Sequence, residues 1–282
     1  MRATLWKGLG AAVLLAAAVT TVTAAEDYRK RASHEGAGSY TKVSDVEAEI
    51  KFGRDVGARV LGRYRLQDNK RLTHYLNLVG KAVALHAGRP ELEYRFALVQ
   101  SDNINAYAAP GGYIFITTGA LAQMRDESEL AAVLAHEVAH VTERHIVKAL
   151  NIRGADQSPE AGLARLVGGA GDPARVAFHQ AVDKAMEILF EKGLQQQDEF
   201  DSDRIALTLL ANTGYDPGAL KRYLARVQAL KGGETKVVST THPSFDSRLA
   251  KIDELARSEG FAELKQPTVK ERFNEYIKTS KQ

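Results

Sequence analysis

The sequence predicts an α+β protein that is mostly helical, with its helices around a small sheet. Two observations lead to this class. Apolar residues recur at helical spacing over most of the chain, whereas two short stretches, 93–100 and 113–117, have the β-branched and aromatic content of strands. A hydrophobic fraction of 44% and a charged fraction of 26% are ordinary for a globular domain.

The first 43 residues predict two segments that precede this domain. Residues 1–25 carry two basic residues and then an uncharged run whose apolar core, 9–19, has the length of a signal-peptide h-region. Small residues at Ala24 and Ala25 suit cleavage, so we expect export, with a retained N-terminal membrane anchor as the alternative. Residues 26–43 are polar and contain Gly and Ser, which predicts a flexible leader.

Residues 44–282 predict a single domain in which helices precede and follow the strands. Helical patterns cover 45–86, and Pro110-Gly111-Gly112 is a turn signal before the 113–117 strand. Later helices are expected at 174–191, 195–213, 217–231 and 246–259. The stretch 151–173 is rich in Gly, Ala and Pro and breaks the pattern. We expect a mobile loop there, which is either a lid over a neighbouring site or a plain connector.

The stretch Ala131–His145, AAVLAHEVAHVTERH, places two histidines and a glutamate in an apolar helix. Positions four apart lie about 40° apart on a helix, so His136 and His140 can offer two imidazoles to one ion. Zinc accepts imidazole nitrogen, and Glu137 is placed to take the proton of a water that attacks a carbonyl carbon. The alternative is a pair of hydrogen-bonded core histidines, which the His-Glu-x-x-His pattern makes less favourable.

The third ligand has to come from outside this helix. His145 lies nine residues beyond His136, about 180° away on a continuous helix, so we expect it to pack or to hydrogen-bond at the surface. Four acids crowd the start of the 195–213 helix. Glu199 and Asp203 share a face, which suits Glu199 as ligand and Asp203 as acceptor for the free N–H of a bound imidazole. The alternative is a solvated acidic face that complements the helix dipole.

The order of these motifs resembles the gluzincin zinc metallopeptidases of the HtpX, Oma, BepA and Ste type. In that family a His-Glu-x-x-His helix is followed by a helix that carries Glu-x-x-x-Asp. The stretches SDNINAYAAPGGYIFITTGAL, LFEKGLQQQDEFDSDRIA and THPSFDSRLAKI resemble further family segments in the same order. One departure is Ser202, where the family usually has Ala. The resemblance implies a zincin-like domain with a single zinc ion held by His136, His140 and Glu199.

The resemblance also implies where a substrate binds. An edge strand beside the zinc would add an extended peptide by backbone hydrogen bonds. The residues that would contact substrate are Asn105, Ala106, Gly111, Gly112 and Tyr113. His242 and Arg248 would each stabilise the oxyanion. The alternatives from the residues themselves are an ordinary hairpin at Pro110–Gly112, a His-Pro turn residue, and a surface arginine.

The function implied is a zinc endopeptidase that hydrolyses unfolded or misassembled envelope proteins in quality control, most simply in the periplasm. The alternative is a chaperone-like protein that holds unfolded chains in a zinc cleft with little proteolysis, although Glu137 favours the enzyme. The net charge of +3 gives no indication of nucleic-acid binding. The absence of cysteine excludes disulfides and a lipid attached at cysteine. Association with the membrane periphery and the oligomeric state stay open.

Overall fold

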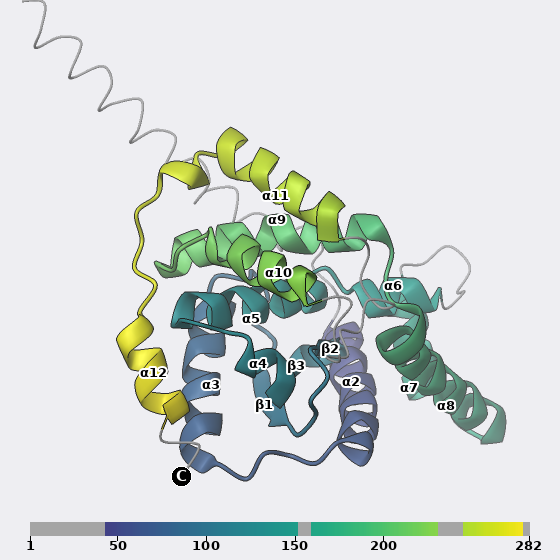
Figure 1. Cartoon of the computed structure of the whole chain (residues 1–282). Coiled ribbons are helices and arrows are strands. Elements are labelled where there is room, and N and C mark those ends of the chain that lie inside the picture. The colour runs from purple at the N-terminus through teal and green to yellow at the C-terminus, as the bar shows by residue number, and fades with distance from the viewer. Residues whose placement is uncertain (1–42, 152–158, 231–244, 279–282) are drawn as a thin grey trace, which may run out of the picture.

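The structure, a computed structural model, describes residues 43–151, 159–230 and 245–278. It begins with two helices, α2 (Val43–Arg63) and α3 (Lys70–Ala84), which fulfil the helical prediction for 45–86. Asn69 caps α3 by accepting a hydrogen bond from the Leu72 amide. The two helices lie on either side of the sheet in Figure 1. The predicted signal peptide, the predicted leader up to residue 42, and residues 231–244 with His242 lie outside the described residues.

The sheet has three strands in the order β1-β3-β2. Both predicted strands are present, as β1 (Arg95–Val99) and β3 (Tyr113–Thr117), and they pair in parallel. The third strand, β2 (Ala106–Ala109), pairs antiparallel to β3 with Ala106 opposite Ile116. Strand β3 lies between β1 and β2, so it is not the edge strand that the family resemblance implies beside the zinc. The edge beside the site is β2, whose three alanines have low strand propensity and gave no strand signal.

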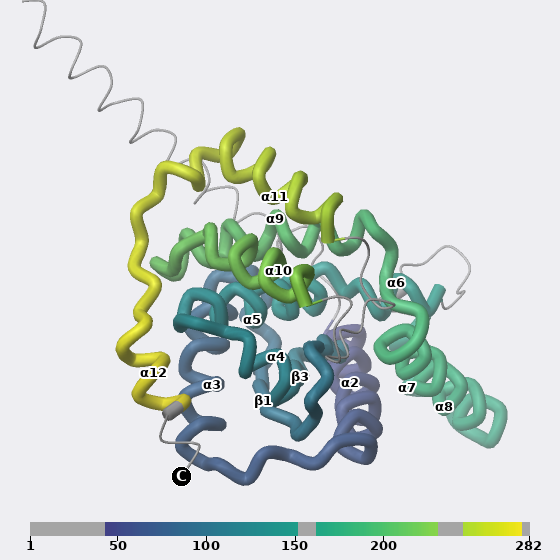
Figure 2. Tube along the Cα trace, in the orientation of Figure 1, coloured from purple at the N-terminus to yellow at the C-terminus, as the bar shows by residue number. Residues whose placement is uncertain are grey.

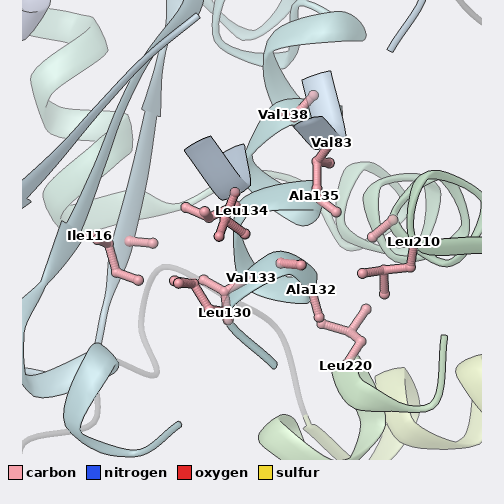
Figure 3. Packing of buried hydrophobic residues seen from close by; sticks show 14 of the residues in the cluster. Val83, Ile116, Leu130, Ala132, Val133, Leu134, Ala135, Val138, Leu210 and Leu220 are labelled. Atoms are coloured by element: carbon pink, nitrogen blue, oxygen red, sulfur yellow. The ribbon is translucent and has the colours of Figure 1, made fainter. Parts of the chain in front are cut away.

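Helix α5 (Glu127–Thr142) runs through the centre of the molecule, and all of its residues are buried. The sheet and α3 pack on one side of it, and α9 (Gln196–Thr213) and α10 (Ala219–Ala229) pack on the other. Figure 3 shows Leu130 and Leu134 directed toward Ile116 of β3, and Ala132 close to Leu220 of α10. The many alanines of α5 let these elements approach the helix closely. Because α5 is buried on all of its faces, its sequence shows little alternation between an apolar and a polar face.

The C-terminal half is helical, as expected. It contains α8 (Asp172–Glu187), which ends in one π-helical turn, η2 (Ile188–Lys192), and then α9, α10 and α11 (Phe245–Ser258). Of the predicted loop at 151–173, residues 152–158 lie outside the described residues, and the rest contains α7 (Pro159–Gly168). Helix α7 packs against α2 and α8, so its apolar residues are used in tertiary contacts. The trace in Figure 2 shows α12 (Lys270–Lys278), a helix that was not predicted, beside α3.

A buried acid at the start of α5 ties four segments together. Glu127 accepts hydrogen bonds from Tyr75 on α3 at 2.8 Å, from Tyr215 after α9 at 2.6 Å, and from Arg272 on α12 at 2.6 Å. We call these four residues the Glu127 cluster. Because each carboxylate oxygen meets donors, the buried charge is compensated. The cluster therefore fixes the position of α5 relative to the C-terminal segment.

Among the described residues, no helix combines the length and apolar character needed to cross a membrane.

Candidate metal centre

The two histidines of α5 point to the same place. The Nε2 atoms of His136 and His140 lie 3.0 Å apart, and both rings are 4% exposed. One helical turn separates the residues, so the rings meet edge to face with centroids 4.6 Å apart. This is the arrangement that the spacing of four residues predicts.

Helix α9 brings the third side chain to the histidines. The helix starts with a capping box between Gln195 and Asp198, which places Glu199 in the first turn against α5. Glu199 is fully buried, with Oε2 3.4 Å from Nε2 of His136 and Oε1 3.6 Å from Nε2 of His140. One ligand atom from each of the three residues lies within 4.8 Å of the others. Two imidazole nitrogens and a carboxylate oxygen are a donor set that zinc takes in catalytic sites.

Two further buried residues surround this group. Asp203 Oδ1 lies 3.0 Å from Nδ1 of His136, the ring nitrogen that faces away from the other ligands. Arg248 of α11 donates to both oxygens of Asp203, at 2.8 Å through Nε and 2.6 Å through Nη2, and its Nη1 lies 3.1 Å from Glu199 Oε2. One guanidinium therefore holds the two carboxylates of α9 in a fixed geometry.

Asp203 and Arg248 stabilise each other in their charged forms. Burial alone would raise the pKa of Asp203, but the charge of Arg248 and hydrogen bonds from His136 and Arg248 hold that pKa below its usual range. Burial alone would lower the pKa of Arg248, but Asp203 and Glu199 outweigh it and raise that pKa. Asp203 is therefore a carboxylate that can accept the N–H of His136, as the E-x-x-x-D spacing predicts.

Glu137 borders two small cavities. The first, of about 60 Å³, extends toward α10 and is also lined by His136, Arg248 and Asn105. The second, of about 30 Å³, extends toward η2 and is also lined by His140 and Glu199. Ala106 of the edge strand lines both. Glu137 thus lines the space that a group entering from the β2 edge would reach beside His136, His140 and Glu199.

The other expected contact residues lie elsewhere. Gly111 has a φ of 71°, its N–H donates to Glu49 of α2 at 3.2 Å, and an added Cβ would lie 2.7 Å from the Ile50 Cα. Gly112 abuts the Glu93 carbonyl in the same way. The Tyr113 ring lies beneath the guanidinium of Arg95. These residues serve the close packing of the turn against α2 and β1, and their contact with substrate stays a prediction.

The acids of α9 divide as their helical positions predict. Glu199 and Asp203 are buried, whereas Asp201 is half-buried and accepts from Gln197 at 3.1 Å. Asp198 closes the capping box. Ser202, the departure from the family pattern, is fully buried, and its Oγ lies 3.5 Å from His145 Nδ1.

His145 is packed, as one of its two expected roles required, but the expectation that it points away from the other histidines is wrong. The residue is 3% exposed, and its Nδ1 lies 2.8 Å from Nδ1 of His140. The prediction assumed that the helix continues, but α5 ends at Thr142, and Arg144 adopts left-handed backbone angles before α6 (His145–Leu150) begins. The sequence carries no Gly or Pro at this point to signal the break.

A buried His-Glu-x-x-His helix joined by a glutamate from a later helix defines a metallopeptidase domain of the zincin class. More particularly, residues 70–256 match the sequence profile of peptidase family M48, and the chain belongs to this family. Peptidases of this family use zinc, in agreement with the donor set described above. The family resemblance of the motifs is thereby confirmed.

The chain is 30% identical over 223 residues to the beta-barrel assembly-enhancing protease of Escherichia coli K12. That alignment covers 73% of this chain and 43% of the relative. The mitochondrial metalloendopeptidase OMA1 of Schizosaccharomyces pombe is 27% identical over 214 residues, which are 74% of this chain and 61% of that protein. The chain therefore spans less than two thirds of the length of either relative.

Proposed function

We propose that the chain is a zinc endopeptidase in which His136, His140 and Glu199 hold the metal. The observation that carries the proposal is the placement of Glu137, a buried carboxylate that borders both cavities beside the three ligands. When bound, zinc supplies a Lewis acid that polarises a peptide carbonyl and lowers the pKa of water. Three protein ligands leave a coordination position open for this chemistry.

Glu137 acts as the general base. It follows the ligand His136 directly in α5, so its side chain leaves the helix about 100° round the axis from that of His136. It accepts a proton from the attacking water and delivers it to the nitrogen of the cleaved peptide bond. A protein that only held unfolded chains would not need a carboxylate here, which makes the chaperone-like alternative the weaker one.

The substrate lies along β2. Among the described strands β2 pairs with β3 alone, so its other edge can add an extended peptide through backbone hydrogen bonds. Asn105 and Ala106 line the first cavity at the start of this edge. The rest of that cavity is largely apolar, formed by Ile104, Val133, Leu220, Tyr223, Leu224, Val227 and Phe245. An apolar lining suits the side chains that unfolded proteins expose, which supports substrates of that kind.

Arg248 serves the ligands. Its guanidinium is engaged by Asp203 and Glu199, so a role in holding these carboxylates fits its contacts better than an oxyanion contact. His242 remains the candidate for contact with the oxyanion, a role that rests on the family resemblance alone. Asp203 accepts the Nδ1 proton of His136 and thereby fixes its tautomer.

The physiological role we infer is quality control of envelope proteins. The N-terminal pattern of residues 1–25 supports export to the periplasm, and the name of the E. coli relative refers to the assembly of beta-barrels. Unfolded or misassembled envelope proteins are therefore the proposed substrates.

The test compares the wild type with Glu137→Gln for zinc content and casein digestion. The wild type should bind about one zinc ion per chain and digest casein until a chelator is added. Glu137→Gln should keep zinc and fold but lose activity by orders of magnitude, because the amide cannot accept the proton. Glu143→Gln is the matched control, since Glu143 pairs only loosely with the exposed Lys148 at 3.4 Å. Normal digestion by Glu137→Gln would contradict the assignment.

A further inference from the structure

The two histidine ligands have different partners on their outer nitrogens. Nδ1 of His136 faces the Asp203 carboxylate at 3.0 Å. Nδ1 of His140 faces another imidazole, with Nδ1 of His145 at 2.8 Å and the ring centroids 5.0 Å apart. Both rings are buried. Metal-bound histidines usually donate this proton to a carboxylate, a backbone carbonyl or water, so an imidazole in this place needs its own explanation.

A break in the backbone brings His145 to this position. On an uninterrupted helix it would lie about 140° round the axis from His140. Instead Arg144 adopts φ 55° and ψ 36°, angles that residues with a Cβ seldom take. Arg144 Nε lies 3.4 Å from Glu49 Oε2, and Glu49 is itself paired with the buried Arg89 at 3.0 Å. This buried group of charges on α2 and after α3 supports a turn that returns His145 to the ligand.

The protons of the pair follow from the geometry of the metal centre. A metal on Nε2 of His140 requires the lone pair of that nitrogen, so the neutral ring carries its proton on Nδ1. That proton points at Nδ1 of His145, which must then be the acceptor and carry its own proton on Nε2. Nε2 of His145 lies 3.6 Å from Asp198 Oδ1, so a carboxylate stands at the end of the chain.

We propose that His145 is a positioning residue for the zinc ligand His140, a role that rests on the proposed metal centre. It accepts the Nδ1 proton of His140, which fixes the tautomer and the ring plane so that Nε2 faces His136 and Glu199. Asp198 orients His145 in turn from the Nε2 side, and Ser202 Oγ lies 3.5 Å from the Nδ1 that accepts the His140 proton. The alanine usual in the family would leave out that contact.

The test measures zinc affinity by chelator competition in the full chain for His145→Leu, His145→Asn and the wild type. The leucine fills the space without an acceptor, so zinc affinity should fall about 10–100-fold. The asparagine can place its Oδ1 near the position of Nδ1 and should restore affinity to within a few-fold of the wild type. His179→Leu, on the exposed face of α8, is the matched control and should bind zinc as the wild type does.

Two further measurements separate positioning from packing. The absorption spectrum of the cobalt-substituted protein reports ligand geometry and should change in His145→Leu but not in His145→Asn. The gain in melting temperature on adding zinc should shrink in His145→Leu alone. Unchanged zinc affinity and cobalt spectrum in His145→Leu would overturn the proposal, as would equal losses in both variants. A wild type that binds zinc but leaves casein intact would contradict the proposed function only, because these measurements concern metal binding.

Discussion

Helix α5 buries polar groups at both ends, and the two ends are built in opposite ways. At the N-terminal end, Glu127 meets the hydroxyls of Tyr75 and Tyr215 and the guanidinium of Arg272. Glu129, close by, is held by both terminal nitrogens of Arg226 at 2.7 Å. At the C-terminal end, His136 and His140 direct Nε2 at each other and at the carboxylate of Glu199, at distances of 3.0–3.6 Å.

The difference distinguishes a structural acid from a metal ligand. A buried carboxylate surrounded by hydroxyls and guanidinium groups has its charge compensated, so it stabilises the fold without a ligand. At the metal centre Arg248 meets Oε2 of Glu199 at 3.1 Å, but two imidazole nitrogens and the carboxylate still converge on one point in a buried site, which is costly unless a cation lies between them. Burial alone therefore does not identify the functional end of α5, whereas the chemistry of the facing atoms does. The following variants test this distinction, beginning with the largest expected effect.

Removal of the carboxylate ligand Glu199 should abolish metal binding. Glu199→Ala takes away a carboxylate that faces both histidines, so zinc content and casein digestion should both be lost. Asp201→Ala is the matched variant on the same helix, because Asp201 contacts Gln197 and points away from the metal centre. It should retain zinc and activity. Equal loss of metal in both variants would refute Glu199 as the ligand.

Removal of the outer charge should weaken the metal centre without dismantling it. Asp203→Asn can still accept a hydrogen bond but leaves Arg248 with one carboxylate fewer and polarises His136 less. We expect zinc affinity or activity to fall about 10–100-fold, with partial rescue by excess zinc. Competition with a chelator and a zinc titration of activity measure this. Wild-type values for both would assign Asp203 to packing alone.

At the other end of α5, a change should affect stability but not zinc. Glu127→Gln removes the charge that Arg272 meets, so the free energy of unfolding should fall. Because Arg272 is 55% exposed and water screens the pair, we expect a loss of only about 1–3 kcal/mol. Zinc content should stay at the wild-type level. Urea denaturation and metal analysis check the two halves. A loss of zinc here would show that the two ends of α5 are not independent.

The smallest effect is expected in how the difference in stability between the wild type and Glu127→Gln depends on pH. Burial alone would raise the pKa of Glu127, but hydrogen bonds from Arg272, Tyr215 and Tyr75 outweigh it and lower that pKa below 4.5. A lowered pKa in the folded state means that the ionised form stabilises the fold above about pH 4.5 and loses this contribution as the pH falls through the folded pKa. The stability gap between wild type and Glu127→Gln should therefore shrink in acid. A gap that stays constant down to pH 3 would argue against the ionised carboxylate as its source.

Much of this arrangement is readable from local spacing. The interval of four residues puts His136 beside His140 and Glu199 beside Asp203 on their helices, whatever the rest of the chain does. The positions of β1, β3, α9 and α11 follow from periodicity and turn residues in the same way. Strand β2 does not, because its three alanines have low strand propensity and the strand is held by its pairing with β3. Helix α12 was not predicted, although its Lys, Glu and Arg residues favour a helix.

By itself, therefore, the sequence determined which side chains share a helical face and where the helices at 45–86, 195–213 and 246–259 lie. Only the tertiary structure decided which strand lies at the edge, because strand order depends on the pairing of β1 with β3 rather than on the composition of either. It also decided the place of His145, since the left-handed turn at Arg144 is held by Glu49, a residue 95 positions away. Periodicity describes contacts within one element, whereas such long-range partners appear only once the chain has folded.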